Sequence, residues 1–160
     1  MTVAGKNGVD MEECFTSGQL FTLHGLIPKD FLNLFIIGFS QASVGVNQTQ
    51  RLDEQTLNIA YTIREAEKKN GGKKAVIQPS DTACEEWANR TARYAYMLAT
   101  TANCTPSYFN AEGEADRMTP EQQAGAARLA IWGQGYLAYA RTLQEWRAKG
   151  GLEGLEVAAA

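Results

Sequence analysis

The chain has 160 residues, 44% of them hydrophobic, which is enough to bury one ordinary core. Its formal net charge is −3 and its basic residues are dispersed, so neither nucleic acid nor an anionic membrane is indicated as a partner. No apolar run reaches the roughly 18–20 residues of a membrane helix, and the first residues lack a signal-peptide core, so we expect an intracellular, cytoplasmic protein.

The first half of the chain predicts a loop, one strand and one helix. Residues 1–19 are polar and rich in glycine, which indicates an N-terminal loop segment. The apolar run Asn33-Leu-Phe-Ile-Ile-Gly38 is typical of a strand buried on both faces. After a polar loop, a helix ending near Asn70-Gly71-Gly72 is predicted by a stripe at three- and four-residue spacing: Leu52, Thr56, Ile59, Ile63 and Ala66.

The second half is predicted to be mainly helical. Residues 75–79 form a short extended piece, and Ser80 or Asp81 can cap a helix. The predicted core stripe of that helix is Cys84, Trp87, Ala88, Thr91, Tyr94, Ala95 and Leu98.

A long loop separates this helix from the last two. Thr119-Pro120 is a typical helix start, with Thr as the N-cap and Pro in the first turn. The segment Trp132-Gly-Gln-Gly135 interrupts the helical pattern, and a last helix ends at Gly150-Gly151. Residues 152–157 suit a final short strand or an extended tail. One strand followed by helices and long loops resembles the end of an α/β domain, because a complete one needs several strands.

Several residues are candidates for chemistry, each with a structural alternative. His24, the only histidine, is either a loop hydrogen-bonding residue, which we favour, or a site residue. Glu112, Glu114 and Asp116 lack the spacing of an EF-hand and favour a solvated acidic loop over a cation site. The cysteines Cys14, Cys84 and Cys104 suggest neither a disulfide framework nor a zinc site, and no metal is expected.

Two further patterns have a functional and a structural interpretation. Gly133-Gln-Gly135-Tyr-Leu-Ala138 matches the dinucleotide pattern G-x-G-x-x-A, but a helix precedes it where a strand is needed, which favours a turn between helices. Tyr108 and Phe109 are aromatic residues in a loop, so they either line a ligand pocket or cover the core.

Three motifs follow one another along the chain. The first is Asn33-Leu-Phe-Ile-Ile-Gly-Phe-Ser-Gln-Ala-Ser43, the second Cys104-Thr-Pro-Ser-Tyr-Phe-Asn110 with Glu112-Gly113, and the third Glu145-Trp-Arg-Ala-Lys-Gly150 with residues 152–157. In this order they resemble the closing strand with its flavin-side loop, the cap loop and the C-terminal ending of Baeyer-Villiger-type flavin monooxygenases. The resemblance is nearest to the fungal and hydroxyacetophenone-monooxygenase-like branch, which suggests a role in secondary metabolism.

The resemblance implies a fold, cofactors and a reaction. The fold would be mostly α with a minor β component, the remnant C-terminal part of an α/β FAD-binding domain. Residues 20–72 would carry the closing strand, the flavin-side loop and its helix, and residues 73–160 a helical cap region. In the complete enzymes NADPH reduces FAD, and a flavin peroxide inserts oxygen into a ketone to give an ester or lactone.

The resemblance also implies positions for site residues, although no catalytic residue can be assigned. Those beside the flavin would be Gly38, Phe39, Ser40 and Gln41, followed by Val46 and Asn47 at the start of the helix. Those in the loop over substrate or NADPH would be Tyr108, Phe109 and Asn110. The loop Gly38-Phe39-Ser40-Gln41-Ala42 departs from the relatives' G-P-x-S-P, which leaves the detailed flavin contacts open.

The family's two nucleotide-binding glycine motifs, its peroxide-stabilising arginine and its signature sequence are not in these 160 residues. We therefore expect a truncated or partial enzyme that binds no cofactor alone and acts with a complementary flavin-binding chain or as a homo-oligomer. Two alternatives remain: a cofactor-free binding or interaction protein, and a small biosynthetic isomerase or cyclase that uses Tyr108, His24 or the acidic loop.

Overall fold

The computed structural model describes residues 2–96, 104–113 and 117–160, without the side chains of residues 108, 109 and 111. The predicted class, mostly α with a minor β component, is confirmed. The helices are α1 (Met11–Thr16), α2 (Gln48–Lys69), α3 (Asp81–Ala92), α5 (Pro120–Arg128) and α6 (Tyr136–Lys149), with short 3-10 helices η1 (Lys6–Gly8) and η2 (Tyr108–Gly113). The strands are β1 (Thr22–Leu23), β2 (Ile27–Pro28), β3 (Ala75–Pro79) and β4 (Leu155–Ala159).

The four strands form two small antiparallel sheets. β1 and β2 make a tight hairpin, with Leu23 opposite Ile27. β3 pairs with β4, so the two short extended segments predicted from the sequence lie side by side, with Ile77 opposite Val157. Side chains on β3 alternate between buried and half-buried, as the two-residue period of a strand requires.

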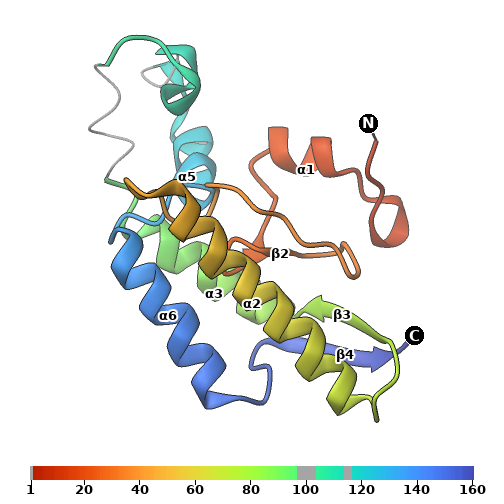
Figure 1. Cartoon of the computed structure of the whole chain (residues 1–160). Coiled ribbons are helices and arrows are strands. Elements are labelled where there is room, and N and C mark those ends of the chain that lie inside the picture. Colours follow the sequence, from red (N-terminus) through yellow and green to blue (C-terminus); the bar gives the residue numbers. More distant parts are fainter. Residues whose placement is uncertain (1, 97–103, 114–116) are drawn as a thin grey trace.

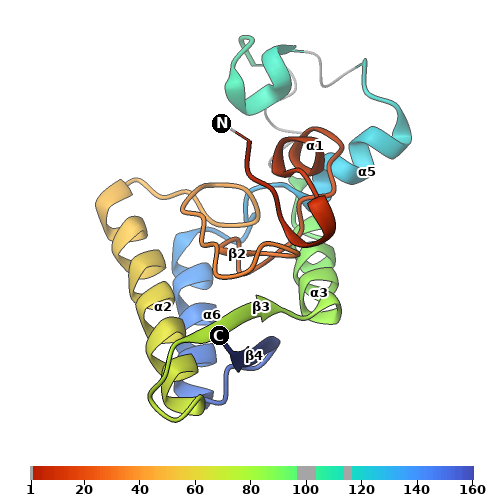
Figure 2. The same cartoon turned by 90° about the vertical axis from the view of Figure 1, so that its right-hand side faces the viewer.

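The helices surround the hairpin. Figure 1 shows α2 and α6 running side by side, and these two helices pack against each other. Figure 2 shows the β1–β2 hairpin between this pair and α3, which packs on β1 and on α5. The β3–β4 sheet lies at the end of α2 where the helix finishes. Among the described helices, none combines the length and the apolarity needed to cross a membrane.

One core joins the two halves of the chain. Leu26 and Ile27 of the hairpin region are buried in the same cluster as Trp87 of α3, Leu143 of α6 and Trp132, which lies between α5 and α6. The indole rings of Trp87 and Trp132 are stacked, with centroids 4.7 Å apart and planes inclined by 13°. The segments 20–72 and 73–160, which the sequence distinguishes, therefore share their apolar interior.

The predicted buried strand at residues 33–38 is wrong. This segment has no regular secondary structure, and the side chain of Ile37 is 49% exposed. Its backbone is bonded to two different segments, because the Asn33 amide donates to the Ile77 carbonyl and the Ile36 amide to the Leu26 carbonyl. Asn33 has a φ of 55°, which ends any extended run there. The segment therefore makes one backbone hydrogen bond to β3 and one to the hairpin region, and it pairs as a strand with neither.

The predicted helix over residues 52–66 is confirmed, but its buried face differs from the predicted stripe. Thr56 and Ile63 are exposed, and Leu52 and Ile59 are only partly buried. The residues that face the interior are mostly polar: Arg51, Glu54, Gln55, Asn58, Thr62 and Ala66. These polar groups tolerate burial because they bond to one another and to α6, as described below.

The predicted helix starts agree with the structure. Ser80 caps α3 through its hydroxyl, which accepts a hydrogen bond from the Ala83 amide at 3.3 Å. Thr119 caps α5 in a reciprocal capping box with Gln122. The segment 1–19, expected to be a loop, contains η1 and the short helix α1, whose N-cap is Asp10.

Candidate functional site

An apolar groove of about 560 Å³ lies between the N-terminal segment, the hairpin region and the loop that precedes α2. Phe15 of α1 and Ile37 of the loop are each 49% exposed beside it. Glu12 is the one ionisable residue among the described side chains that line it. The lining residues are Val3, Met11, Glu12, Phe15, Leu20, Gly25, Ile36, Ile37, Gly38, Phe39 and Ser40.

Three of the predicted flavin-side residues, Gly38, Phe39 and Ser40, line this groove. Arg51 contacts two of these residues. Its Nη1 donates to the Gly38 carbonyl at 2.8 Å, and its guanidinium lies 4.6 Å from the centre of the Phe39 ring. Gln55 donates a second hydrogen bond to the same carbonyl, at 3.2 Å. The groove wall is therefore fixed to the first turns of α2.

Arg51 itself is 2% exposed, and burial lowers the pKa of its guanidinium. Its hydrogen-bond partners are neutral, namely the Gly38 carbonyl and the side chains of Gln48 and Gln55. No carboxylate pairs with it in the described part of the chain. The stripe predicted from the sequence does not include Arg51, Glu54 or Gln55, although their three- and four-residue spacing is as regular as that of the apolar residues.

Gln41 is fully buried and does not line the groove. Its side-chain oxygen accepts hydrogen bonds from the Thr22 amide and hydroxyl, and its Nε2 donates to the Arg128 carbonyl at 2.9 Å. Ser40 donates through its hydroxyl to the Leu129 carbonyl at 3.0 Å. These contacts join the loop to the end of α5 and fix its conformation.

Val46 and Asn47 lie beyond the groove. Val46 is fully exposed, and Asn47 is the N-cap of α2, its side-chain oxygen accepting from the Gln50 amide at 3.0 Å. That oxygen occupies the position at the start of the helix where an anion would otherwise bind.

The predicted substrate or NADPH loop corresponds to η2. The side chains of Tyr108 and Phe109 lie outside the described part of the structure. Asn110 is 4% exposed and closes the loop: its Oδ1 accepts from the Ser107 amide at 2.7 Å, and its Nδ2 donates to the Cys104 carbonyl at 3.1 Å. Of the acidic residues in this loop, Glu112 is exposed, and Glu114 and Asp116 lie outside the described residues.

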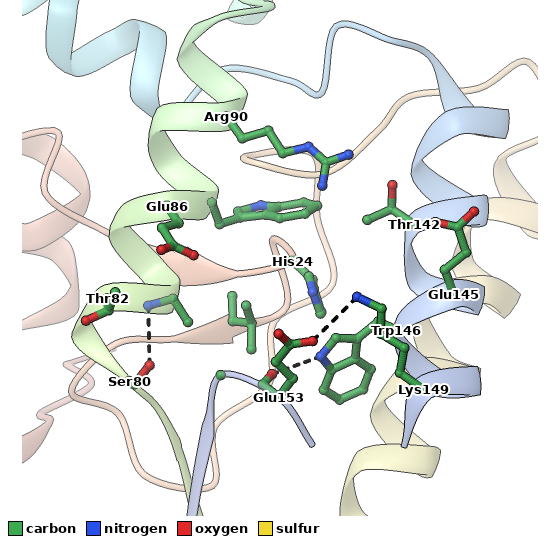
Figure 3. Close-up of a pocket in the computed structure, with 14 residues that line it drawn as sticks. His24, Ser80, Thr82, Glu86, Arg90, Thr142, Glu145, Trp146, Lys149 and Glu153 are labelled. Carbon is green, nitrogen blue, oxygen red and sulfur yellow. Dashed lines mark hydrogen bonds and ion pairs between the residues drawn. The ribbon is translucent and has the colours of Figure 1, made fainter. Parts of the chain in front are cut away.

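His24 is 4% exposed at the tip of the hairpin (Figure 3). Its ring makes edge contacts with Trp87 and Trp146, at centroid distances of 4.9 and 5.0 Å. Burial, together with the positive charges of Arg90 and Arg147, lowers its pKa to about 3. The ring is therefore neutral at physiological pH, and its surroundings are those of a core residue.

The glycine pattern at residues 133–138 is a turn between helices, as its preceding helix indicated. α5 ends at Arg128 and α6 begins at Tyr136, so no strand leads into the turn. A Cβ at Gly133 would lie 1.9 Å from the Tyr94 carbonyl oxygen, so this glycine allows close contact between two backbone segments. No cluster of metal-ligating side chains occurs in the described residues either.

No family model matches the chain. It is 40% identical over 160 residues to the FAD-binding monooxygenase ausC of Aspergillus calidoustus, which covers 98% of the chain and 24% of that protein. It is 41% identical to the FAD-binding monooxygenase prhK of Penicillium brasilianum, with 98% and 25% covered. The chain thus spans about a quarter of the length of the curated relatives it matches.

Solved structures give the same result. The polycyclic ketone monooxygenase of Thermothelomyces thermophila superposes with a TM-score of 0.89 at 32% identity, over 99% of this chain and 24% of that one. Cyclohexanone monooxygenase from Rhodococcus sp. Phi1, solved with bound NADP+, shares the fold with a TM-score of 0.71 at 20% identity, over 100% of this chain and 27% of that one. In sequence and in fold, the chain corresponds to part of a flavin monooxygenase of the Baeyer-Villiger type, as its three motifs predicted.

Proposed function

We propose that the chain forms the flavin-side wall of an FAD- and NADPH-dependent Baeyer-Villiger-type monooxygenase and does not catalyse a reaction alone. The complete enzyme would insert oxygen into a ketone to give an ester or a lactone. The observation that carries the proposal is the match to FAD-binding monooxygenases over 98% of the chain, combined with a groove lined by the loop that the motif assigns to the flavin side.

The described residues suit one edge of a flavin ring but not its phosphates. Ile36, Ile37 and Phe39 offer an apolar wall for a flat ring. A diphosphate needs free backbone amides at a strand–helix turn. In the described chain, the glycine turn at residues 133–135 packs on Tyr94, and the start of α2 is capped by Asn47. FAD would supply the redox chemistry, and its phosphates would have to be held by other residues.

A complementary flavin-binding polypeptide is the partner that this surface suits best. Phe15 and Ile37 line the groove and are each half exposed, so burial of their apolar surface against a partner would be favourable. The alternative of an acid–base isomerase is not supported at His24, because that imidazole is buried among indole rings. The second candidate to cover this surface is another copy of the chain in a homo-oligomer.

The experiment is the visible absorption spectrum of the purified chain after incubation with FAD and removal of free ligand. We expect no flavin band, because a single wall cannot retain the cofactor. A yellow protein with one FAD per chain would overturn the proposal. Light scattering on the same sample tests whether the chain forms a homo-oligomer. A stable homodimer whose contact buries Phe15 and Ile37 would favour the interaction protein instead.

A further inference from the structure

Arg51 is a buried positive charge behind the wall of the apolar groove. It belongs to the first turn of α2, the helix into which the groove loop leads (Figure 1). It does not line the groove itself, but it contacts Gly38 and Phe39, which do. The Gly38 peptide group and the Phe39 ring therefore lie between this charge and the groove.

The charge of Arg51 is not neutralised by an acidic side chain. In the described part of the chain no carboxylate forms an ion pair with it. Glu54, the acidic residue on the same buried face of α2, pairs with Arg147 of α6 instead. A guanidinium stays protonated in proteins, and a charge removed from water is only weakly screened. Its field consequently reaches the side of the groove that Gly38 and Phe39 form.

The groove carries little negative charge that could oppose this field. Glu12 is the one ionisable residue among the described side chains that line it. It lies at the start of α1 and is exposed, so water screens its charge more strongly than that of Arg51. The remaining lining is apolar or uncharged, and a buried charge acts more strongly in such surroundings than in water. The electrostatic potential beside Phe39 is therefore positive.

The loop that lines the groove also offers hydrogen-bond donors. The backbone amides of Gly38 and Ser40 have no acceptor among the described residues, whereas the Gln41 amide in the same loop donates to the Ala130 carbonyl. A backbone N–H without a partner in the protein binds water or an acceptor atom of a ligand. Hydrogen bonds to an anionic oxygen are stronger than those to a neutral one. The donors and the field of Arg51 thus favour the same class of ligand.

We propose that the groove binds flat aromatic ligands and prefers them as anions, and that Arg51 sets this preference from behind the wall without touching the ligand. The apolar side chains of Ile36 and Ile37 would contact the ring, and the negative charge would lie on the side of Gly38 and Ser40. Arg51 is in this sense a positioning residue that determines specificity. The inference rests on the proposed function only in taking the groove as the ligand side of the chain.

The test uses the whole chain and two fluorescent probes with the same aromatic skeleton, the anion anilinonaphthalene sulfonate and the neutral N-phenyl naphthylamine. Arg51→Gln should weaken binding of the anion about three- to tenfold and binding of the neutral probe less than about twofold. Arg51→Lys, which keeps the charge, should restore the preference for the anion. A purely structural role of Arg51 would change the affinity for both probes alike.

Arg64→Gln is the matched control, because it removes the same charge from an exposed position of α2 that does not line the groove. It should leave both affinities unchanged, whereas Ile37→Gln in the groove should weaken both. Circular dichroism establishes that each variant is folded.

The native chain gives a test that needs no Arg51 variant. Naphthoate should displace the bound sulfonate probe, and naphthylmethylammonium should not. Equal displacement by the two ions would overturn the proposal. So would an affinity ratio of the two probes that is the same in Arg51→Gln as in the native chain, or probe binding that Ile37→Gln does not affect. A yellow protein in the absorption experiment would overturn the proposed function alone, because neither fluorescent probe depends on FAD.

Discussion

At the scale of single residues, Arg51 links the wall of the groove to α2. It is a buried cation with neutral oxygen partners and an aromatic ring, and it contacts the backbone of the loop that lines the groove. Such a group is retained only where its hydrogen bonds are complete, because the desolvation of a charge is expensive. We therefore assign the loop conformation of Gly38 and Phe39 to Arg51 more than to the loop sequence itself.

Arg51→Met should destabilise the chain by about 1–3 kcal/mol, because it removes donors to buried oxygens of Gly38 and Gln55. Urea denaturation measures the loss. Arg64→Met, on the same helix with a side chain 67% exposed, is the control and should change stability by less than about 0.5 kcal/mol. Equal effects of the two substitutions would show that Arg51 does not anchor the loop.

His24 should make stability depend on pH below neutrality. Its pKa is 6.5 in the unfolded chain and about 3 in the folded one, so between these values only the unfolded state binds the proton. Stability is therefore unaffected above pH 6.5 and falls as the pH drops below it, by about 1.4 kcal/mol per pH unit from this group.

The measurement is urea denaturation of the native chain and of His24→Asn between pH 7 and pH 5. Asn tolerates the positive φ of 61° at this position and does not titrate there. The stability difference between the two proteins should shrink as the pH falls. A constant difference, or an imidazole NMR signal that titrates near pH 6.5 in the folded protein, would contradict the burial of a neutral ring.

At the scale of elements, the sequence predicted the four longer helices α2, α3, α5 and α6, but it predicted neither α1 nor the pairing of the strands. Helix starts at Ser80 and Thr119 depend on local capping chemistry, which neighbouring residues determine. The pairing of β3 with β4 joins residues far apart in the chain, which no local pattern encodes. The apolar run at residues 33–38 predicted neither its environment nor its partners: none of these residues is fully buried, and its backbone bonds go to the hairpin region and to β3.

The buried face of α2 could not be predicted because its polar groups are compensated from another helix. Glu54 forms a salt bridge at 2.5 Å with Arg147 of α6, and Arg147 also donates to Asn58 at 3.1 Å.

The candidate site, too, depends on contacts between distant parts of the chain, which limited its prediction from the sequence. Gly38, Phe39 and Ser40 line the groove, and their place beside a flavin stays a prediction, whereas Gln41 is buried and bonded to Thr22, a contact that only the folded chain reveals.

Arg147→Met should cost about 3 kcal/mol of stability, because it leaves the Glu54 carboxylate, 10% exposed, without its cation. Replacing both partners, as Glu54→Leu with Arg147→Met, should recover a large part of this loss, since no buried charge is then left alone. The double variant and the two single ones form a cycle measured by urea denaturation. A double variant less stable than Arg147→Met would mean that the pair does not act as a buried ion pair.

At the scale of the whole molecule, the chain has its own core and an apolar groove on one face. The core explains how about a quarter of the length of its relatives keeps their fold, with a TM-score of 0.89 to one of them. Under the function proposed above, the groove would contribute a shaped apolar wall, and other residues would hold the phosphates and complete the flavin site.

A segment exchange tests this account most directly. The matching segment of the polycyclic ketone monooxygenase from Thermothelomyces thermophila would be replaced by this chain, and FAD content and NADPH-dependent oxidation of a polycyclic ketone would be measured. Circular dichroism and gel filtration establish that the chimera is folded. The account predicts a folded chimera with one FAD per molecule and retained NADPH oxidation. A folded chimera that contains no FAD would contradict the assignment of this chain to the flavin side.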